Sequence, residues 1–192
     1  MFLIIFTSIV FFLFVIIYFQ KSAQTKANKE LVKRNLELVK SENEFAEIKL
    51  SKQSKTNNNS NPQLLNERYK LSTINEEQIK ELKNIIINSM TELKLFKDKD
   101  LNLPEYSKKI KENKNRVSQV INQEFNKNFS NFINEYRVKE ARRMLSNTKY
   151  QNLTIEAIAY EVGFSSKSTF NRVFKDITGI TPSFYLQSAK TL

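Results

Sequence analysis

The chain opens with a continuous apolar run, residues 2–19, which contains no charged side chain and only Thr7 and Ser8 as short polar interruptions. A helix rises about 1.5 Å per residue, so the run would span about 27 Å, close to the thickness of a bilayer core. A cleaved signal peptide is the alternative, but no basic residue precedes the run and no small-residue cleavage pattern follows it. The pattern therefore predicts an N-terminal transmembrane helix over residues 2–19.

Positive charges flank this run on one side only. No Lys or Arg precedes it, whereas Lys21, Lys26, Lys29, Lys33 and Arg34 follow it. Basic flanks remain on the cytoplasmic side of a membrane, so we expect a single-pass protein of the cell inner membrane with a C-terminal domain in the cytoplasm. Membrane lipid is then one partner, and we expect the protein to have no sensor domain outside the membrane.

Residues 20–50 are rich in charge and predict a juxtamembrane helix. Leu31, Leu38 and Phe45 lie seven residues apart, and Ile48 follows in the next seam position. Two or three imperfect heptads fit both a short coiled coil and a solvated helix. A homodimer through residues 28–50 therefore stays open at this point.

Polar residues rich in Asn (SKQSKTNNNSNPQ) occupy the next stretch, residues 51–71. This composition cannot bury enough apolar surface to offset the entropy lost on ordering, so it predicts a flexible linker. Beyond the linker, Thr73 and Glu76 fit a capping box, and apolar residues from Ile79 to Leu93 recur three and four positions apart. We expect an amphipathic helix here that packs against the elements following it in the sequence.

The C-terminal part contains two copies of one unit of about fifty residues. LNLPEYSKKI (101–110) aligns with LTIEAIAYEV (153–162), VSQVINQEFN (117–126) with FNRVFKDITG (170–179), and NFSNFI (128–133) with TPSFYL (181–186). Each copy has the order of a cap, a short helix, a tight turn and a second helix, which is typical of a helix-turn-helix unit. A helix over about residues 130–146 joins the two units.

The same pattern predicts which side chains each unit buries. In the second copy Thr154 caps the first helix, and Gly163 supplies a turn residue that can take a positive φ. In the first copy Asn102 is the cap, and Ser107 stands where small Ala159 allows close helix crossing in the second copy. The residues expected to be buried by the second helices are Val117, Val120, Ile121 and Phe125 in the first copy and Phe170, Val173, Phe174 and Ile177 in the second.

The second helix of each copy leaves a polar outer face. Asn, Gln, Arg and Ser together are the side chains that read base edges in the major groove and anchor on phosphates. A bundle whose polar faces only meet water is the alternative for one unit, but two copies in phase favour double-stranded DNA as the partner. The predicted DNA-binding residues are Asn115, Arg116, Ser118, Gln119 and Asn122 in the first copy and Lys167, Ser168, Asn171, Arg172 and Lys175 in the second.

Composition narrows the chemistry further. The formal net charge of +11 points to an anionic partner. The 192 residues include no Cys and no His, so a thiolate metal site and a His base are both excluded. The two Gly residues of the sequence are too few for a Gly-rich phosphate loop. We therefore expect no enzyme activity, no metal and no cofactor.

IEAIAYEVGFSSKSTFNRVFKDITGITPSFY (155–185) and INEYRVKEARRML (133–145) resemble the C-terminal DNA-binding domain of AraC/XylS-type transcription regulators. The resemblance covers about residues 72–190 and implies that bases are read by Asn115, Ser118 and Gln119 in the first unit and by Ser168, Asn171 and Arg172 in the second. Gly179, Thr181 and Pro182 match the closing turn of the family. Lys111 and Asn126 depart from it, because many members carry Gly at these positions.

The β-barrel effector domain of sugar-responsive members has no counterpart here, and the layout is similar to the C-terminal half of membrane-spanning sensor regulators. The expected fold is all-α, with a bundle of about seven helices over residues 72–192. The expected function is membrane-anchored, sequence-specific transcription regulation through two successive major grooves, with RNA polymerase as a further partner if the protein is an activator. A membrane-associated helical protein-interaction module without specific DNA reading is the alternative.

Overall fold

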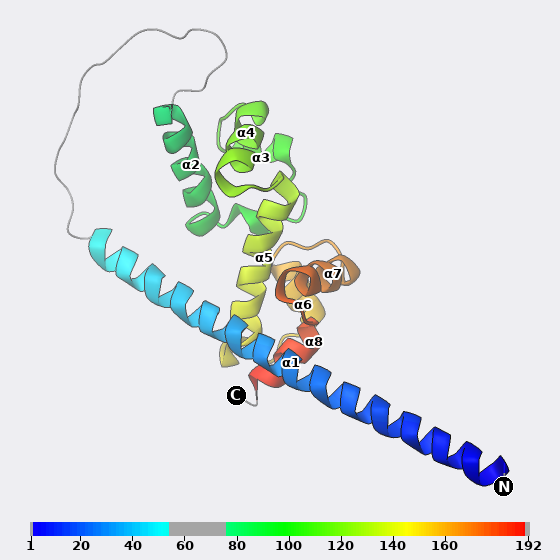
Figure 1. Ribbon diagram of the computed structural model, residues 1–192. Helices are drawn as coiled ribbons and strands as arrows, with labels where there is room; N and C mark the ends of the chain where they lie inside the picture. The colour runs from blue at the N-terminus through cyan, green and yellow to red at the C-terminus, as the bar shows by residue number, and fades with distance from the viewer. Residues whose placement is uncertain (1, 54–75, 191–192) are drawn as a thin grey trace.

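The computed structural model describes residues 2–53 and 76–190, and all regular structure within these ranges is helical (Figure 1). The N-terminal helix stands apart in length, and seven further α-helices with two short 3-10 turns form the C-terminal domain within the described residues. The elements are α1 (Phe2–Gln53), α2 (Glu76–Thr91), η1 (Leu95–Lys97), α3 (Leu103–Lys109), α4 (Lys114–Phe125), α5 (Phe129–Leu145), η2 (Thr148–Tyr150), α6 (Ile155–Glu161), α7 (Lys167–Thr178) and α8 (Pro182–Ala189). The predicted all-α bundle is confirmed.

The internal repeat is confirmed by matching caps. The side chain of Asn102 accepts a hydrogen bond from the amide of Glu105 at the start of α3, and Thr154 accepts one from Ala157 at the start of α6. Such caps satisfy amides that have no partner inside the helix. The other matching pairs of N-caps are Asn113 and Ser166, which begin α4 and α7, and Asn128 and Thr181, which begin α5 and α8.

The backbone conformation at the turns repeats as well. Lys111 has a φ of +58° at the turn where the second unit has Gly163 at +96°, and Asn126 has +54° where the second unit has Gly179 at +80°. A positive φ costs a residue with a Cβ about 1 kcal/mol or more, and Asn tolerates it better than most. The first unit therefore keeps the turn geometry of the second, with strain at Lys111.

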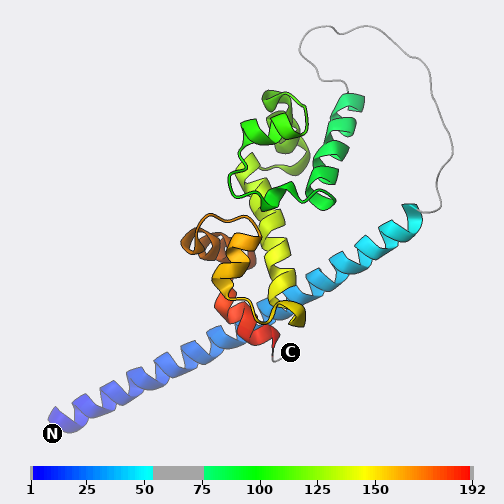
Figure 2. The ribbon, with the colours of Figure 1, turned by 180° about the vertical axis from the view of Figure 1, so that it is seen from behind.

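Each unit has its own apolar core, and α5 contributes to both. Figures 1 and 2 show α5 running from the first unit into the second. Phe132 and Ile133, near the start of α5, pack with α2, α3 and α4. Val138, Ala141 and Met144, further along α5, pack with α6, α7 and α8. A single 17-residue helix thus joins the two units without an intervening loop.

Most of the predicted core residues are buried, and three of these predictions need correction. Ile177 is 43% exposed, and Thr178 is buried in its place with its Oγ1 donating to the carbonyl of Phe174 at 2.7 Å. Leu93 is 65% exposed because α2 ends at Thr91, and Phe96 of η1 enters the first core instead. Phe125 is half-buried at the edge of that core, whereas the other predicted apolar residues of α4 and α7 are buried.

Residues 2–53 form one continuous helix of 52 residues where the sequence predicted two segments, and the helix extends three residues into the predicted linker. The Lys and Glu residues that follow the apolar run also favour a helix. The sequence contains no Gly or Pro before residue 53 that would interrupt it. Within residues 2–53 and 76–190, no helix combines the length and the apolar character that crossing a membrane requires. The transmembrane helix over residues 2–19 therefore stays a prediction.

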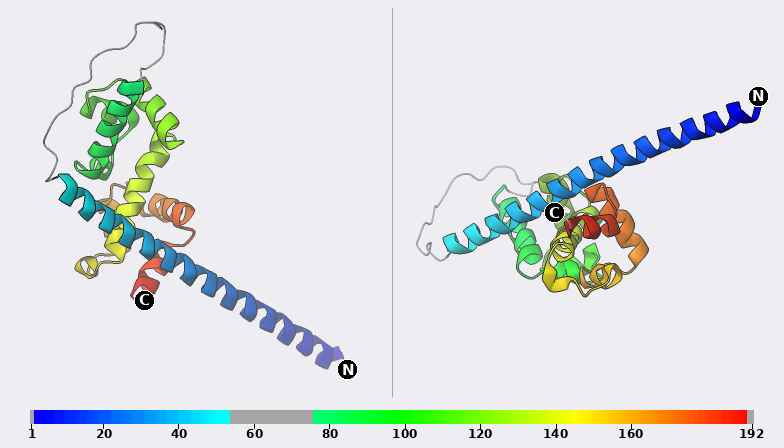
Figure 3. Two further views of the ribbon diagram at one scale, coloured as in Figure 1. Left: turned by 60° about the vertical axis from the view of Figure 1, so that its left-hand side comes forward. Right: turned by 90° about the horizontal axis from the view of Figure 1, so that it is seen from below.

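The middle of α1 lies across α5 and α8, as the views in Figure 3 show. Val32, Asn35 and Val39 are buried there, which neither a coiled coil nor a solvated helix predicted. Leu31, the first seam residue, packs against the second core, whereas Leu38 is 52% exposed. The side chains of the other two seam residues lie outside the described residues, as do Thr73 of the capping box and residues 54–71 of the linker. The homodimer stays a prediction.

Replacing Lys111 with Gly should stabilise the protein by about 0.5 to 1 kcal/mol, because Gly adopts a positive φ without a Cβ penalty. Urea unfolding of the full-length protein followed by circular dichroism measures the difference. Lys108→Gly, three residues earlier inside α3, is the control and should destabilise by about 0.5 to 1 kcal/mol. Destabilisation by both variants would contradict strain at Lys111.

Candidate nucleic-acid interface

The buried inner face of α4 determines which residues of this helix face outward. Val117, Val120 and Ile121 are fully buried in the first core, which fixes the rotation of α4 about its axis. Of the predicted DNA-binding residues on this helix, three are exposed and two are half-buried. The exposed ones are Asn115, Gln119 and Asn122, and the half-buried ones are Arg116 and Ser118. Asn122 donates a hydrogen bond from Nδ2 to the carbonyl of Ser118 at 3.0 Å, which orients its amide along the helix.

The outer face of α7 is exposed along its whole predicted length. Phe170 and Phe174 are fully buried beneath it and fix its rotation. Ser166 caps the helix and lies 3.2 Å from Ser168, Oγ to Oγ, so hydroxyl groups gather at its first turn. The five predicted DNA-binding residues Lys167, Ser168, Asn171, Arg172 and Lys175 are all exposed.

Three of the cationic residues predicted to contact phosphates or bases lie close to carboxylates of the protein itself. Arg172 lies 3.3 Å from Asp176, Lys167 lies 3.8 Å from Glu156, and Arg116 lies 3.7 Å from Glu112. The pairs of Arg172 and Lys167 are solvent-exposed, and such pairs contribute little to stability, about 0 to 1 kcal/mol. These side chains can therefore exchange their carboxylates for the phosphates or base edges of DNA at a small cost.

The two units are joined by Arg137 of α5. Its Nε donates to the carbonyl of Phe96 at 2.8 Å, its Nη2 donates to the carbonyl of Asp98 at 2.9 Å, and its guanidinium lies 5.5 Å from the ring centre of Phe164. Burial lowers the pKa of Arg137 and the charge of Asp98 raises it, but an Arg side chain keeps its charge at any physiological pH. The cation thus binds the segment after α2 to the turn of the second unit.

Gly163 brings the two units into backbone contact at the same point. A Cβ placed on Gly163 would lie 2.5 Å from the carbonyl oxygen of Phe96 and 2.9 Å from that of Lys97. Nearby, Lys97 Nζ lies 2.9 Å from Glu161 Oε1. The turn of the second unit therefore needs Gly for its close approach as well as for its positive φ.

The sequence did not predict these contacts of Arg137 and Gly163 between the two units. The residues that form them come from three separate segments: η1, the middle of α5 and the turn after α6. Two sequence features bear on these contacts: the Gly in the turn after α6, and Arg137 within the sequence of α5. Neither feature identifies its partner before the fold is known.

A polar groove of about 380 Å³ runs between α5 and α7. It explains the exposure of Ile177, which forms part of its wall, and it is adjacent to Arg172 on the predicted recognition face. Lys127 and Glu135 form an ion pair of 2.7 Å on its other wall. The remaining lining residues are Asn131, Asn134, Val173 and Asp176.

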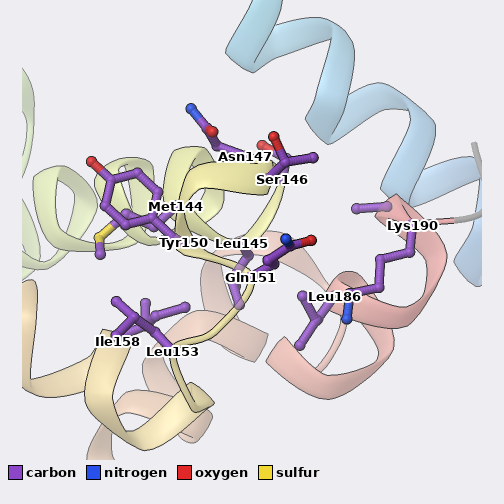
Figure 4. A pocket seen from close by; sticks show the side chains of 12 residues that line it. Met144, Leu145, Ser146, Asn147, Tyr150, Gln151, Leu153, Ile158, Leu186 and Lys190 are labelled. Atoms are coloured by element: carbon purple, nitrogen blue, oxygen red, sulfur yellow. The ribbon is translucent and has the colours of Figure 1, made fainter.

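A second pocket, of about 390 Å³, opens between the end of α5, η2 and α8 (Figure 4). Met144, Leu153 and Leu186 supply its apolar lining, and Lys190 lies at its edge. None of its lining residues belongs to α4 or α7, so this pocket is separate from the predicted recognition faces.

Two helix-turn-helix units on a shared helix define the class of this domain. Residues 106–188, which are fewer than half of the 192, match a family model described as a helix-turn-helix domain. The match spans both units, from α3 to α8.

Curated relatives are regulators of transcription that carry this domain type. The chain is 27% identical over 95 residues to YtdP of Bacillus subtilis (strain 168), an uncharacterised helix-turn-helix-type transcriptional regulator, covering 50% of this chain and 12% of that protein. It is 32% identical over 93 residues to an uncharacterised regulator of the same type from Staphylococcus aureus (strain N315), covering 48% of this chain and 12% of the relative. The chain thus spans only a small part of the length of these relatives.

Among solved structures, the C-terminal domain of AraT, a response regulator from Geobacillus stearothermophilus, is 24% identical. The alignment covers 57% of this chain and 84% of that domain, with a TM-score of 0.47.

Replacing Gly163 with Ala should destabilise the protein by about 2 to 4 kcal/mol, because the added Cβ would clash with backbone that cannot move aside. Gly179→Ala is the matched control, since it also has a positive φ but its Cβ would meet only the flexible end of Leu31, at 3.2 Å. The control should cost about 1 to 2 kcal/mol. Urea unfolding measures both, and equal losses would show that the contact with Phe96 is unimportant.

Proposed function

We propose that this chain is a sequence-specific DNA-binding regulator of transcription of the AraC/XylS type, which reads two successive major grooves with α4 and α7. One observation carries the proposal: two units built alike each expose a polar helix face, and a single helix, α5, holds both. The match of residues 106–188 to a helix-turn-helix domain supports it, and so do the names of the relatives.

The exposed residues have distinct proposed roles. Arg172 and Gln119 carry side chains that form paired hydrogen bonds to guanine and adenine, respectively, so they are proposed to select the site. Lys167 and Lys175 are cationic and exposed, so they are proposed to contact phosphates and supply affinity that does not depend on sequence. The net charge of +11 favours the approach of the protein to DNA.

We further propose that the N-terminal part of α1 attaches the protein to the inner membrane, with the domain on the cytoplasmic side. Phe11, Phe14 and Tyr18 are 71%, 71% and 67% exposed on α1, and exposed apolar side chains on this scale favour contact with lipid. The basic residues that follow complement anionic headgroups. Flotation with vesicles of neutral and anionic phospholipid tests the attachment. The full-length protein should float and a Phe11→Ser, Phe14→Ser variant should float less, whereas a full-length protein that stays at the bottom would refute it.

Selection from a randomised duplex library at about 150 mM salt tests DNA reading, because this salt suppresses purely electrostatic binding. The full-length protein should be used, since Val32 of α1 is buried in the core of the second unit. Enrichment of a motif with two half-sites about 10 base pairs apart is expected for a tandem reader. Recovery without enrichment would favour the alternative, a membrane-associated protein-interaction module.

On the selected motif, Arg172→Ala should weaken binding by about 1 to 3 kcal/mol and relax the preference at one position of the half-site. Lys175→Ala, one helical turn away on the same face, is the matched control and should weaken selected and random DNA alike. Fluorescence anisotropy with both duplexes measures the two losses. An Arg172→Ala loss that is equal on both duplexes would refute a role in base reading.

A further inference from the structure

A surface on the second unit is occupied by residues 31–42 of α1. It is formed by the second half of α5, by α8 and by the last residue of α7. Val32 is 0% exposed and Val39 is 8% exposed, so this part of α1 is as deeply buried as the core of the unit itself. Leu31 and Leu36 pack beside them.

Polar contacts set the position of α1 on this surface. Asn35 accepts a hydrogen bond from Arg142 Nη1 at 3.1 Å through its Oδ1, and its Nδ2 lies 3.4 Å from the carbonyl oxygen of Thr178. Glu42 lies 3.7 Å from Arg142 Nη2 and 3.5 Å from Lys139 Nζ. Hydrogen bonds are directional and charge pairs depend on distance, so together they favour one register of α1 on α5.

Arg142 depends on α1 for its charge partner. Its side chain is only 10% exposed, and among the described residues the carboxylate within ion-pair distance of it is that of Glu42. Removing one partner of a buried charge pair is strongly destabilising, because the remaining charge is left without compensation. The docked α1 therefore supplies the charge partner of Arg142, and a variant that lacks the Glu42 carboxylate while α1 stays docked leaves that charge without compensation.

The contact reaches α7 directly. Thr178 is the last residue of α7, and its carbonyl is one of the groups that a helix end leaves without an internal partner. Gly179, the C-cap of α7, lies close enough to Leu31 that a Cβ there would be 3.2 Å from Leu31 Cδ1. The docked α1 thus holds the C-terminal end of the second recognition helix.

We propose that residues 31–42 of α1 form a coupling element, whose docking on α5 and α8 keeps α7 ordered for binding its half-site. Undocking exposes Arg142 and the end of α7, which loosens the second unit and leaves the first unit intact. The docked segment and the N-terminal part of the chain belong to one continuous helix, Phe2 to Gln53. The DNA consequence rests on the proposed function, whereas the ordering of α7 does not.

Charge reversal at Glu42 tests the coupling in the full-length protein. Glu42→Arg places a cation beside Arg142 and Lys139, whereas Glu37→Arg makes the same charge change on an exposed part of α1 and is the matched control. Asn35→Ala is a milder second variant, in case Glu42→Arg does not fold. Hydrogen exchange of the amides at the end of α7 and in α8 is the measurement.

Exchange there should become about tenfold faster in Glu42→Arg and in Asn35→Ala, with α3 and α4 unchanged. Glu37→Arg should match the unmodified protein. The coupling would be overturned if amide exchange in both test variants equalled that of Glu37→Arg. It would also be overturned if exchange increased equally in the first and second units.

A DNA readout separates this inference from the proposed function. On the selected motif, Glu42→Arg should weaken protection of the half-site read by α7 about tenfold more than that of the other half-site. If the unmodified protein binds no DNA, the proposed function fails, and the hydrogen exchange result still decides whether α1 orders α7.

Discussion

The structure depends on α5 being shared by two cores. Phe132 belongs to the first core and Ala141 to the second, so neither unit can rotate about the helix without opening its own core. Arg137 adds a second constraint, because its guanidinium binds backbone carbonyls of the first unit while lying against Phe164 of the second. Together these contacts make the separation of α4 and α7 a fixed property of the domain, which a reader of two successive grooves requires.

The N-terminal helix extends this logic to the rest of the protein. Its apolar segment and its docked segment lie on the same helix. The docked segment contributes Val32 to the second core, and its Glu42 forms an ion pair with Arg142. The N-terminal and C-terminal parts of the protein are thus linked through one packed surface. Under the proposed coupling, undocking of residues 31–42 and a loss of order in α7 are parts of the same equilibrium.

Much of this arrangement could be predicted from local patterns. The caps Asn102 and Thr154 follow from the internal repeat, because both residue types cap helices. The turn at Lys111 follows only from its alignment with Gly163, since Lys itself does not favour a positive φ. The contacts between distant segments could not be predicted. Arg137 with Phe96, and Glu42 with Arg142, join residues far apart in sequence whose spacing carries no periodic signal. Ile177 was misplaced for a related reason, since helical periodicity does not show that α7 ends against a groove.

The central claim is that α5 and Arg137 hold α4 and α7, the proposed recognition helices, at one separation. Binding of the full-length protein to duplexes in which the spacer between the two selected half-sites is lengthened by five base pairs tests it most directly. Half a turn of DNA moves one half-site to the opposite face, so a rigid domain should lose about 10²-fold or more in affinity, to the level of a duplex with one half-site. Equal affinity for both spacers would contradict a fixed separation of α4 and α7.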